Sequence, residues 1–183
     1  MLRVKFLVIN MMHIGDALLI TPVLRVLRNN FPDAAIDVLT APHLVPLFDC
    51  NPCVRSIKAL SKHPSPAEFV ALLRSIRAEL YDHVINLHRN ELASAVAAFS
   101  NSPHIVGYSK PGFSLFFHEV YPNLKPVMHQ VHSHFAVLRH ALNLSDFTHR
   151  GLEMEIGSEV EEEMRREYEK EFGGAKVVAL NIG

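Results

Sequence analysis

Short apolar segments alternate with segments of helical periodicity along most of this 183-residue chain. The apolar segments that we predict as strands cover residues 4–10, 36–40, 54–60, 83–87 and 104–108. The segments between and after them predict helices over residues 16–29, 65–80, 91–100 and 131–142, and a short helix or turn over residues 42–48. Because successive parallel strands need a crossover, usually a helix, this alternation predicts an α/β fold. We expect a parallel sheet with helices on both faces, and ligands at the carboxyl ends of its strands.

Composition is that of a folded, water-exposed protein. Hydrophobic residues make up 49% of the chain and charged residues 20%, enough for a real core. The apolar run near the N-terminus is too short and too interrupted to cross a membrane, and no small-residue cleavage site follows it. We therefore expect a cytoplasmic location.

Charge is distributed unevenly. Residues 1–157 hold 14 Lys and Arg against 12 Asp and Glu, whereas residues 158–183 hold 4 against 7. All 12 histidines lie in the first segment. This mildly basic body suits an anionic partner, but its charge is far too small to indicate nucleic acid.

The C-terminal part has its own pattern. Residues 152–156 are expected to be extended, and Ser158 with Glu161 predicts a capping box for an acidic, solvated helix over residues 159–172. A strand is predicted over residues 177–181, with no crossover after it, which is a poor ending for a domain. We expect residues 1–157 to form one domain, and residues 158–183 to be a connector and the first strand of a second.

Asp16 follows Gly15 at the end of the first predicted strand, in the segment MHIGDALLITP. Taken alone, the pattern favours a structural role, with Asp16 as a helix N-cap and Gly15 allowing a sharp turn. A carboxylate at this edge of a parallel sheet also suits proton transfer from a hydroxyl nucleophile. Neither of the glycine-rich phosphate-loop motifs is present in the sequence.

The spacing of cysteine and histidine in the sequence gives little support for a metal site or a redox site. Cys50 and Cys53 form a lone C-x-x-C pair without a second ligand pair, and we interpret them as incidental thiols in a turn around Asn51. His129 and His132 have helical spacing, but no carboxylate near them in sequence completes a ligand set. We expect no metal.

Several strings together resemble the lipopolysaccharide heptosyltransferases of glycosyltransferase family 9. They are IGDALLITP after a strand, FPDA, IDVL, an Asn-Pro pair before the third strand, YDHVINLHRNELASA, HIVGYS, an isolated His before a helix and VVALNIG. The resemblance extends over essentially the whole chain. A histidine before IGD looks closest to the heptosyltransferase III-like branch.

The resemblance implies a GT-B fold, in which two Rossmann-like domains face each other across a cleft. The present chain would be the N-terminal, acceptor-binding domain, truncated at the start of the C-terminal domain. The family binds an anionic lipid A–core oligosaccharide as acceptor and ADP-heptose as donor, and inverts the anomeric centre without a metal or other cofactor. Donor-binding residues would lie mostly beyond Gly183, so this chain alone is expected to be inactive. Contact with the inner membrane surface is a further implication.

The family's proposed general base corresponds to Asp16. His13 and Arg89 are candidates for acceptor binding because each follows a strand, although both also suit solvated loops. Lys110 begins a loop where its cation suits acceptor charge, and His129 matches an acceptor-associated histidine of the family. Inward packing is expected for the aromatic residues of that loop, Phe113, Phe116 and Phe117.

Two alternatives stay open. One is a non-catalytic Rossmann-like binding or regulatory module, in which residues 177–183 complete the first sheet. The other is a related GT-B transferase that uses a different nucleotide sugar.

Overall fold

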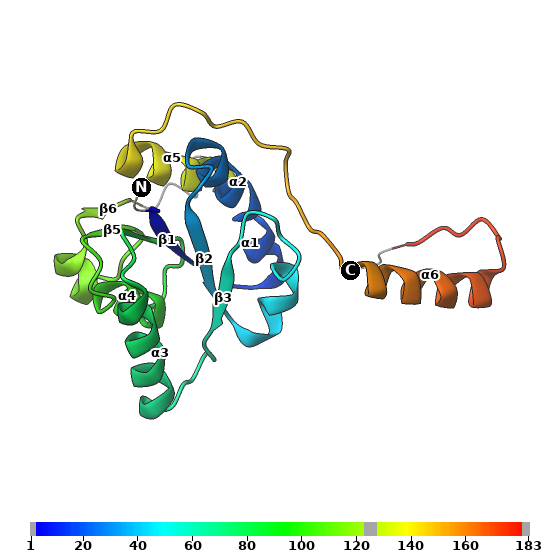
Figure 1. The fold of residues 1–183 in the computed structure, drawn as a ribbon, viewed down its shortest axis with the longest axis horizontal. Helices are drawn as coiled ribbons and strands as arrows, with labels where there is room; N and C mark the ends of the chain where they lie inside the picture. Colours follow the sequence, from blue (N-terminus) through cyan, green and yellow to red (C-terminus); the bar gives the residue numbers. More distant parts are fainter. Residues whose placement is uncertain (1–2, 123–127, 181–183) are drawn as a thin grey trace.

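A six-stranded sheet forms the centre of the computed structural model, which describes residues 3–122 and 128–180 (Figure 1). The strand order is β3-β2-β1-β4-β5-β6, and every pairing is parallel. The strands are β1 (Lys5–Ile9), β2 (Ala35–Thr40), β3 (Ser56–Ala59), β4 (His83–Asn86), β5 (His104–Gly107) and β6 (Glu119–Val120). The five predicted strands are confirmed. β6 was not predicted, because a two-residue strand is too short to show a periodic pattern.

Helices cover both faces of the sheet, as predicted (Figure 1). They are α1 (Ile14–Leu18), α2 (Thr21–Asn30), the 3-10 helix η1 (Pro42–Leu47), α3 (Pro66–Glu79), α4 (Glu91–Ala98), the 3-10 helix η2 (Pro111–Phe116), α5 (Gln130–Leu142) and α6 (Ser158–Phe172). Apolar residues of α2 and α5 share one core cluster on one side of the sheet, and those of α3 and α4 share a second on the other. The α/β class expected from the sequence is therefore confirmed.

The single helix predicted over residues 16–29 is wrong, because the chain breaks between α1 and α2. Pro22 has no N–H and cannot bond to the carbonyl oxygen of Leu18, four residues earlier. The hydroxyl of Thr21 donates to that carbonyl instead, at 2.8 Å. The same hydroxyl accepts the N–H of Glu153 at 3.0 Å, so the break also anchors the chain that follows α5.

The start of α3 agrees with the helix predicted from the sequence, whereas the start of α6 differs from the prediction. The helix predicted over residues 65–80 is α3; Ser65 caps it in a complete capping box with Glu68, and Pro66 is its first helical residue. The capping box predicted for α6 is wrong: Gly157 is the N-cap, Ser158 lies inside the helix, and no side chain caps it.

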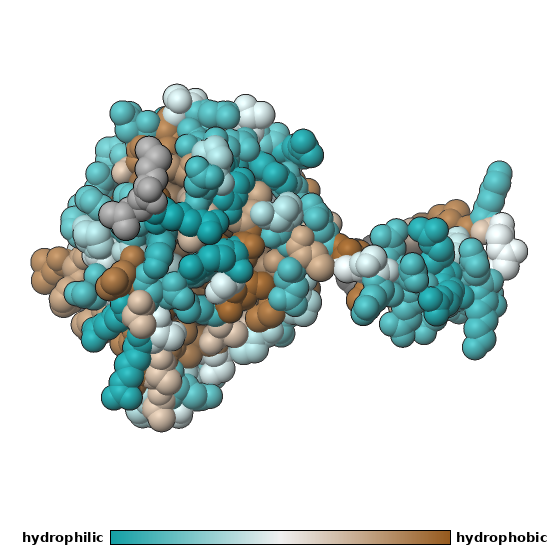
Figure 2. All heavy atoms as spheres, in the orientation of Figure 1, coloured by the Kyte–Doolittle hydropathy of each residue, from teal (hydrophilic) through white to brown (hydrophobic). Residues whose placement is uncertain are grey.

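Residues 158–180 are exposed throughout, and α6 lies apart from the sheet (Figure 1). The predicted solvated character of this acidic helix is confirmed, and its surface is mostly hydrophilic in Figure 2. Residues 177–180 form no strand, because no neighbouring strand supplies hydrogen-bond partners; residues 181–183 lie outside the described residues. The extended segment predicted over residues 152–156 is likewise not part of a sheet.

The aromatic loop after β5 packs inward only in part. Phe117 is buried, Phe113 is half-buried against the α3–α4 core, and Phe116 is 48% exposed. The prediction of inward packing is therefore wrong for Phe116, which lies at the end of η2. Within residues 3–122 and 128–180, no helix is both long and apolar enough to span a bilayer.

Candidate functional site

The carboxyl ends of β1 and β4 lie side by side, although two strands separate them in sequence. Ile9 is in register with Asn86 across this pair. The strand order reverses here, with β2 and β3 on one side and β5 and β6 on the other. In open α/β sheets such a reversal leaves a crevice where ligands bind.

Two buried asparagines shape the loops that leave these strands. The Oδ1 atom of Asn10 accepts the N–H of Met12, and that of Asn86 accepts the N–H of His88, each at 3.1 Å. The Nδ2 atom of Asn86 donates to the carbonyl oxygen of Tyr108 at 2.6 Å, which ties the β4 loop to the end of β5. Asn86 is thus a loop anchor, a role that its position in the sequence did not indicate.

Gly107 permits this close approach of β4 and β5. Its φ is +120°, and a Cβ atom there would lie 2.1 Å from the carbonyl oxygen of Asn86. A residue with a side chain would collide with the β4 backbone at the edge of the site.

Asp16 lies in the first turn of α1, at the switch point between β1 and β4. The structure corrects its predicted cap role: His13 is the N-cap, and Asp16 is the third residue of the helix. Helix N-termini favour nearby negative charge, so the position still suits a carboxylate. The sharp turn expected at Gly15 is also wrong, because Gly15 is helical, with open space where its side chain would be.

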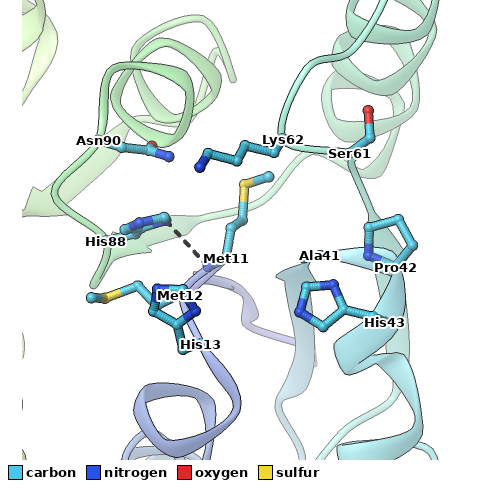
Figure 3. Close-up of a pocket in the computed structure, with 10 residues that line it drawn as sticks. All are labelled: Met11, Met12, His13, Ala41, Pro42, His43, Ser61, Lys62, His88 and Asn90. Carbon is cyan, nitrogen blue, oxygen red and sulfur yellow. Dashed lines mark hydrogen bonds between the residues drawn. The ribbon is translucent and has the colours of Figure 1, made fainter.

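His88 joins the two loops. Its Nδ1 atom accepts the backbone N–H of Met11 at 3.3 Å (Figure 3). Burial lowers the pKa of His88 to about 4, with Asp16 opposing the shift and His13 adding to it. These couplings place the His88 ring in the electrostatic neighbourhood of both Asp16 and His13.

A pocket of about 500 Å³ opens beside these loops (Figure 3). It is lined by residues that follow four different strands: Met11, Met12, His13, Ala41, Pro42, His43, Ser61, Lys62, His88 and Asn90. The Lys62 side chain extends in this view from the β3 side toward Asn90 (Figure 3). Imidazoles, an ammonium group and an amide thus surround a partly apolar hollow, an arrangement suited to a polar ligand with negative charge.

The four residues predicted for acceptor binding occupy different places. His13 lines the pocket. Arg89 does not, because its guanidinium carbon lies 3.9 Å from the centroid of the Tyr108 ring. Lys110 is an exposed residue at the start of η2, and His129 is the N-cap of α5, where its Nδ1 accepts the N–H of Val131.

Arg89 has unused hydrogen-bonding capacity. Its Nε and Nη2 atoms are buried, and no partner for either is found in the described part of the chain. The guanidinium also contacts Tyr108, but buried N–H donors without a partner are costly unless an anion or water binds them.

The sequence interpretation missed His43, Ser61, Lys62, His88 and Asn90 as pocket residues. A usable signal did exist for them. Each of these residues follows a predicted strand, and the carboxyl ends of parallel strands meet at one edge. The strand order, which the sequence pattern does not specify, was needed to show which of these ends are neighbours.

No set of three metal-ligating side chains is found within residues 3–122 and 128–180. Cys50 and Cys53 are free thiols in a turn that Asn51 stabilises by accepting the N–H of Cys53 at 2.9 Å. Burial raises the pKa of Cys53, which makes it a poor thiolate.

Comparisons with known proteins agree with this fold. No protein family model matches the chain. A region of 78 residues, 40% of the chain, is 36% identical to "Lipopolysaccharide heptosyltransferase 3" of Escherichia coli and covers 23% of that protein.

Solved structures are similar over more of the chain. A family 9 glycosyl transferase from Veillonella parvula is 28% identical, with a TM-score of 0.87 over 96% of this chain and 52% of its own. Escherichia coli ADP-heptose lps heptosyltransferase II, 22% identical, has a TM-score of 0.70 over 90% of this chain and 50% of its own. Heptosyltransferase WaaC with ADP-2-deoxy-2-fluoro heptose, 17% identical, has a TM-score of 0.66 over 80% of this chain and 51% of its own. The chain thus spans about half the length of its solved relatives.

Proposed function

Because the chain is related to glycosyltransferase family 9 and its lipopolysaccharide heptosyltransferases over about half of their length, we propose that it forms the acceptor-binding half of an inverting heptosyltransferase. The observation that carries this proposal is the position of Asp16. Asp16 is in the first turn of α1, which follows the β1 loop at the switch point of the sheet; it is not among the residues that line the pocket, but His13, three residues earlier, is.

In the proposed reaction, Asp16 acts as general base. It takes the proton of an acceptor hydroxyl while that oxygen bonds to the anomeric carbon of the heptose and ADP leaves with the electrons of the broken bond. Attack opposite the leaving group inverts the anomeric centre. No metal is proposed, since the carboxylate alone can accept the proton of the attacking hydroxyl.

The acceptor is proposed to be the anionic lipid A–core oligosaccharide. His13 and Lys62 supply polar and cationic groups in the pocket, and the two unpaired nitrogens of Arg89, Nε and Nη2, support anion binding near the loop after β4. Lys110 and His129 are proposed as more distant contacts. His129 is the N-cap of α5. In the same helix, the ring of His134 lies 5.9 Å from the ring of Tyr108, which follows β5.

ADP-heptose is the proposed donor, bound by a second domain of which residues 158–183 are the beginning. The exposed stripe of Val160, Met164, Tyr168 and Phe172 along α6 supports this boundary, since such a stripe normally packs against another element. On this proposal the 183-residue chain alone transfers no sugar. The self-contained module is disfavoured, because residues 177–180 do not join the sheet.

Binding and turnover test the proposal separately. Calorimetry should show that the chain binds deacylated lipopolysaccharide core oligosaccharide but not ADP-heptose; failure to bind the oligosaccharide would contradict the acceptor assignment.

In a version that includes a donor-binding half, Asp16→Asn should lower kcat by about 10²–10⁴-fold without unfolding the protein. Asp49→Asn, a change of an exposed acid in the turn after η1, is the matched control. Near-normal kcat in Asp16→Asn would refute the base, and assays with other nucleotide sugars would identify a different donor.

We also propose that the protein acts at the cytoplasmic face of the inner membrane through an apolar patch, defined as Phe99, Leu115 and Phe116. Leu115 is 91% exposed, and the rings of Phe99 and Phe116 lie 5.6 Å apart. Hydrophobic side chains protrude where Figure 1 draws residues 111–116 in lime green (Figure 2).

Cations flank this patch. Arg77 donates from Nε to the carbonyl oxygen of Phe99 at 2.8 Å, and Lys110 immediately precedes η2. Exposed apolar side chains beside cations are suited to a surface of anionic lipid.

A further inference from the structure

One ring nitrogen of His88 is committed to the protein backbone. Its Nδ1 atom accepts the N–H of Met11, so this nitrogen must carry a lone pair. The neutral ring therefore carries its proton on Nε2. His88 as a whole residue is only 9% exposed.

The other nitrogen is available to a ligand. His88 lines the pocket between the β1 and β4 loops, and no hydrogen-bond partner of Nε2 is found in residues 3–122 or 128–180 (Figure 3). A donor that faces a pocket and has no partner among the described residues is suited to an acceptor atom on a bound molecule.

Burial keeps the His88 ring neutral at physiological pH. Burial lowers the pKa of His88 to about 4, and the partial opposition of Asp16 does not overcome it. A ring in this state gives up no proton in the reaction, and its role is to donate a hydrogen bond.

A cation and an anion both act near the pocket. Lys62 follows β3 and supplies a cation, whereas His88 lies within the electrostatic influence of the Asp16 carboxylate. An anionic group would be attracted to Lys62 and repelled near Asp16. An uncharged hydroxyl oxygen is therefore better suited than an anionic group to accept a hydrogen bond from Nε2 of His88.

We propose that the Nε2–H of His88 is a fixed hydrogen-bond donor that selects a hydroxyl oxygen of the sugar acceptor and holds it beside Asp16. This inference rests on the proposed function, and it makes His88 an acceptor-binding residue of the same site.

Two substitutions of His88 test the roles of the two ring nitrogens separately. In His88→Asn the side-chain oxygen replaces Nδ1 and keeps the bond to Met11, but nothing donates from the place of Nε2. In His88→Gln the longer amide places a donor near the position of Nε2. Calorimetry with deacylated lipopolysaccharide core oligosaccharide should show affinity about tenfold weaker for His88→Asn and largely recovered in His88→Gln.

A second measurement uses the unaltered chain. Nitrogen-15 NMR of the histidine rings at pH 7 should show the Nε2–H tautomer for His88, and the Nε2–H signal should shift when the oligosaccharide binds. An Nδ1–H tautomer would overturn the inference even if the substituted chains failed to fold.

The outcomes distinguish the two proposals. Equal affinities for the unaltered chain and folded His88→Asn would overturn the role of His88 and leave the proposed function standing. Failure of the unaltered chain to bind the oligosaccharide would instead contradict the proposed function.

Discussion

Single polar residues at strand ends decide which side chains reach the pocket. The side chain of Asn86 accepts the N–H of His88 and donates to the carbonyl oxygen of Tyr108. These two hydrogen bonds fix the path of the backbone after β4. His88 consequently lines the pocket, and Arg89 lies over the Tyr108 ring. Two adjacent residues are thus assigned to different surroundings by one buried amide.

Stability should fall in acid because of buried histidine. The folded-state pKa of His88 is about 4, below the ordinary value of about 6.5, so the unfolded chain binds more protons between these pH values. Folding stability from this residue is fully present above pH 6.5 and falls as the pH drops toward 4. We expect a loss of about 2–3 kcal/mol between pH 7 and 4.5 in urea unfolding.

His88→Asn is the control for this prediction, because asparagine does not titrate. Its unfolding free energy should depend less steeply on pH than that of the unaltered chain. Some dependence should remain from His83, whose pKa burial also lowers, with His104 adding to the shift. Identical pH profiles for the two chains would show that His88 is not a buried neutral group.

At the scale of elements, the sheet and α6 differ in how they are held. Helix α2 is connected to the chain after α5 by the hydroxyl of Thr21, which accepts the N–H of Glu153, and by the ion pair of Arg25 with Glu153 at 2.6 Å. Among the described residues, no hydrogen bond or ion pair joins residues 158–180 to those before Gly157. The helix therefore contributes little to the stability of the sheet domain.

Ending the chain after Gly157 should leave the sheet domain folded. Since every removed residue that the structure describes is exposed, the free energy of unfolding should change by less than about 1 kcal/mol. Urea denaturation monitored by far-ultraviolet circular dichroism measures this change. Glu153→Gln, which weakens the ion pair with Arg25, is a control expected to destabilise more. A loss above about 2 kcal/mol on truncation would contradict the proposed boundary.

At the scale of the whole molecule, the catalytic candidate and the apolar patch belong to different surfaces. The pocket lies at the ends of β1 to β4, and the patch lies at the ends of α4 and η2. This separation allows the protein to touch a lipid surface while its pocket stays open to an acceptor.

Replacing Leu115 and Phe116 together by serine should weaken binding to vesicles that contain phosphatidylglycerol. Each buried apolar side chain contributes about 1.5–3 kcal/mol, so the partition coefficient in a sedimentation assay should fall by at least about tenfold. The matched control is Val178→Ser, which changes an 80% exposed residue far along the chain and should have no effect. Equal binding by the double variant, or no binding by the unaltered chain, would exclude this surface as the membrane contact.

The sequence by itself determined the features that depend on near neighbours along the chain. Alternating apolar segments predicted five strands, helical periodicity predicted a helix over residues 65–80, and Asp16 was located at the end of the first strand. Such features are local, because helices and caps are set by residues three or four positions apart.

Only the tertiary structure decided which strand ends are neighbours and which way their side chains point. The strand order brings β4 beside β1, which assembles His13, His88 and Lys62 around one pocket. The same dependence explains the errors: residues 177–180 have a strand-like sequence but no partner strand, and Phe116 has an aromatic side chain but no core above it. Strand pairing and side-chain burial depend on partners distant in sequence, and a local pattern does not identify those partners.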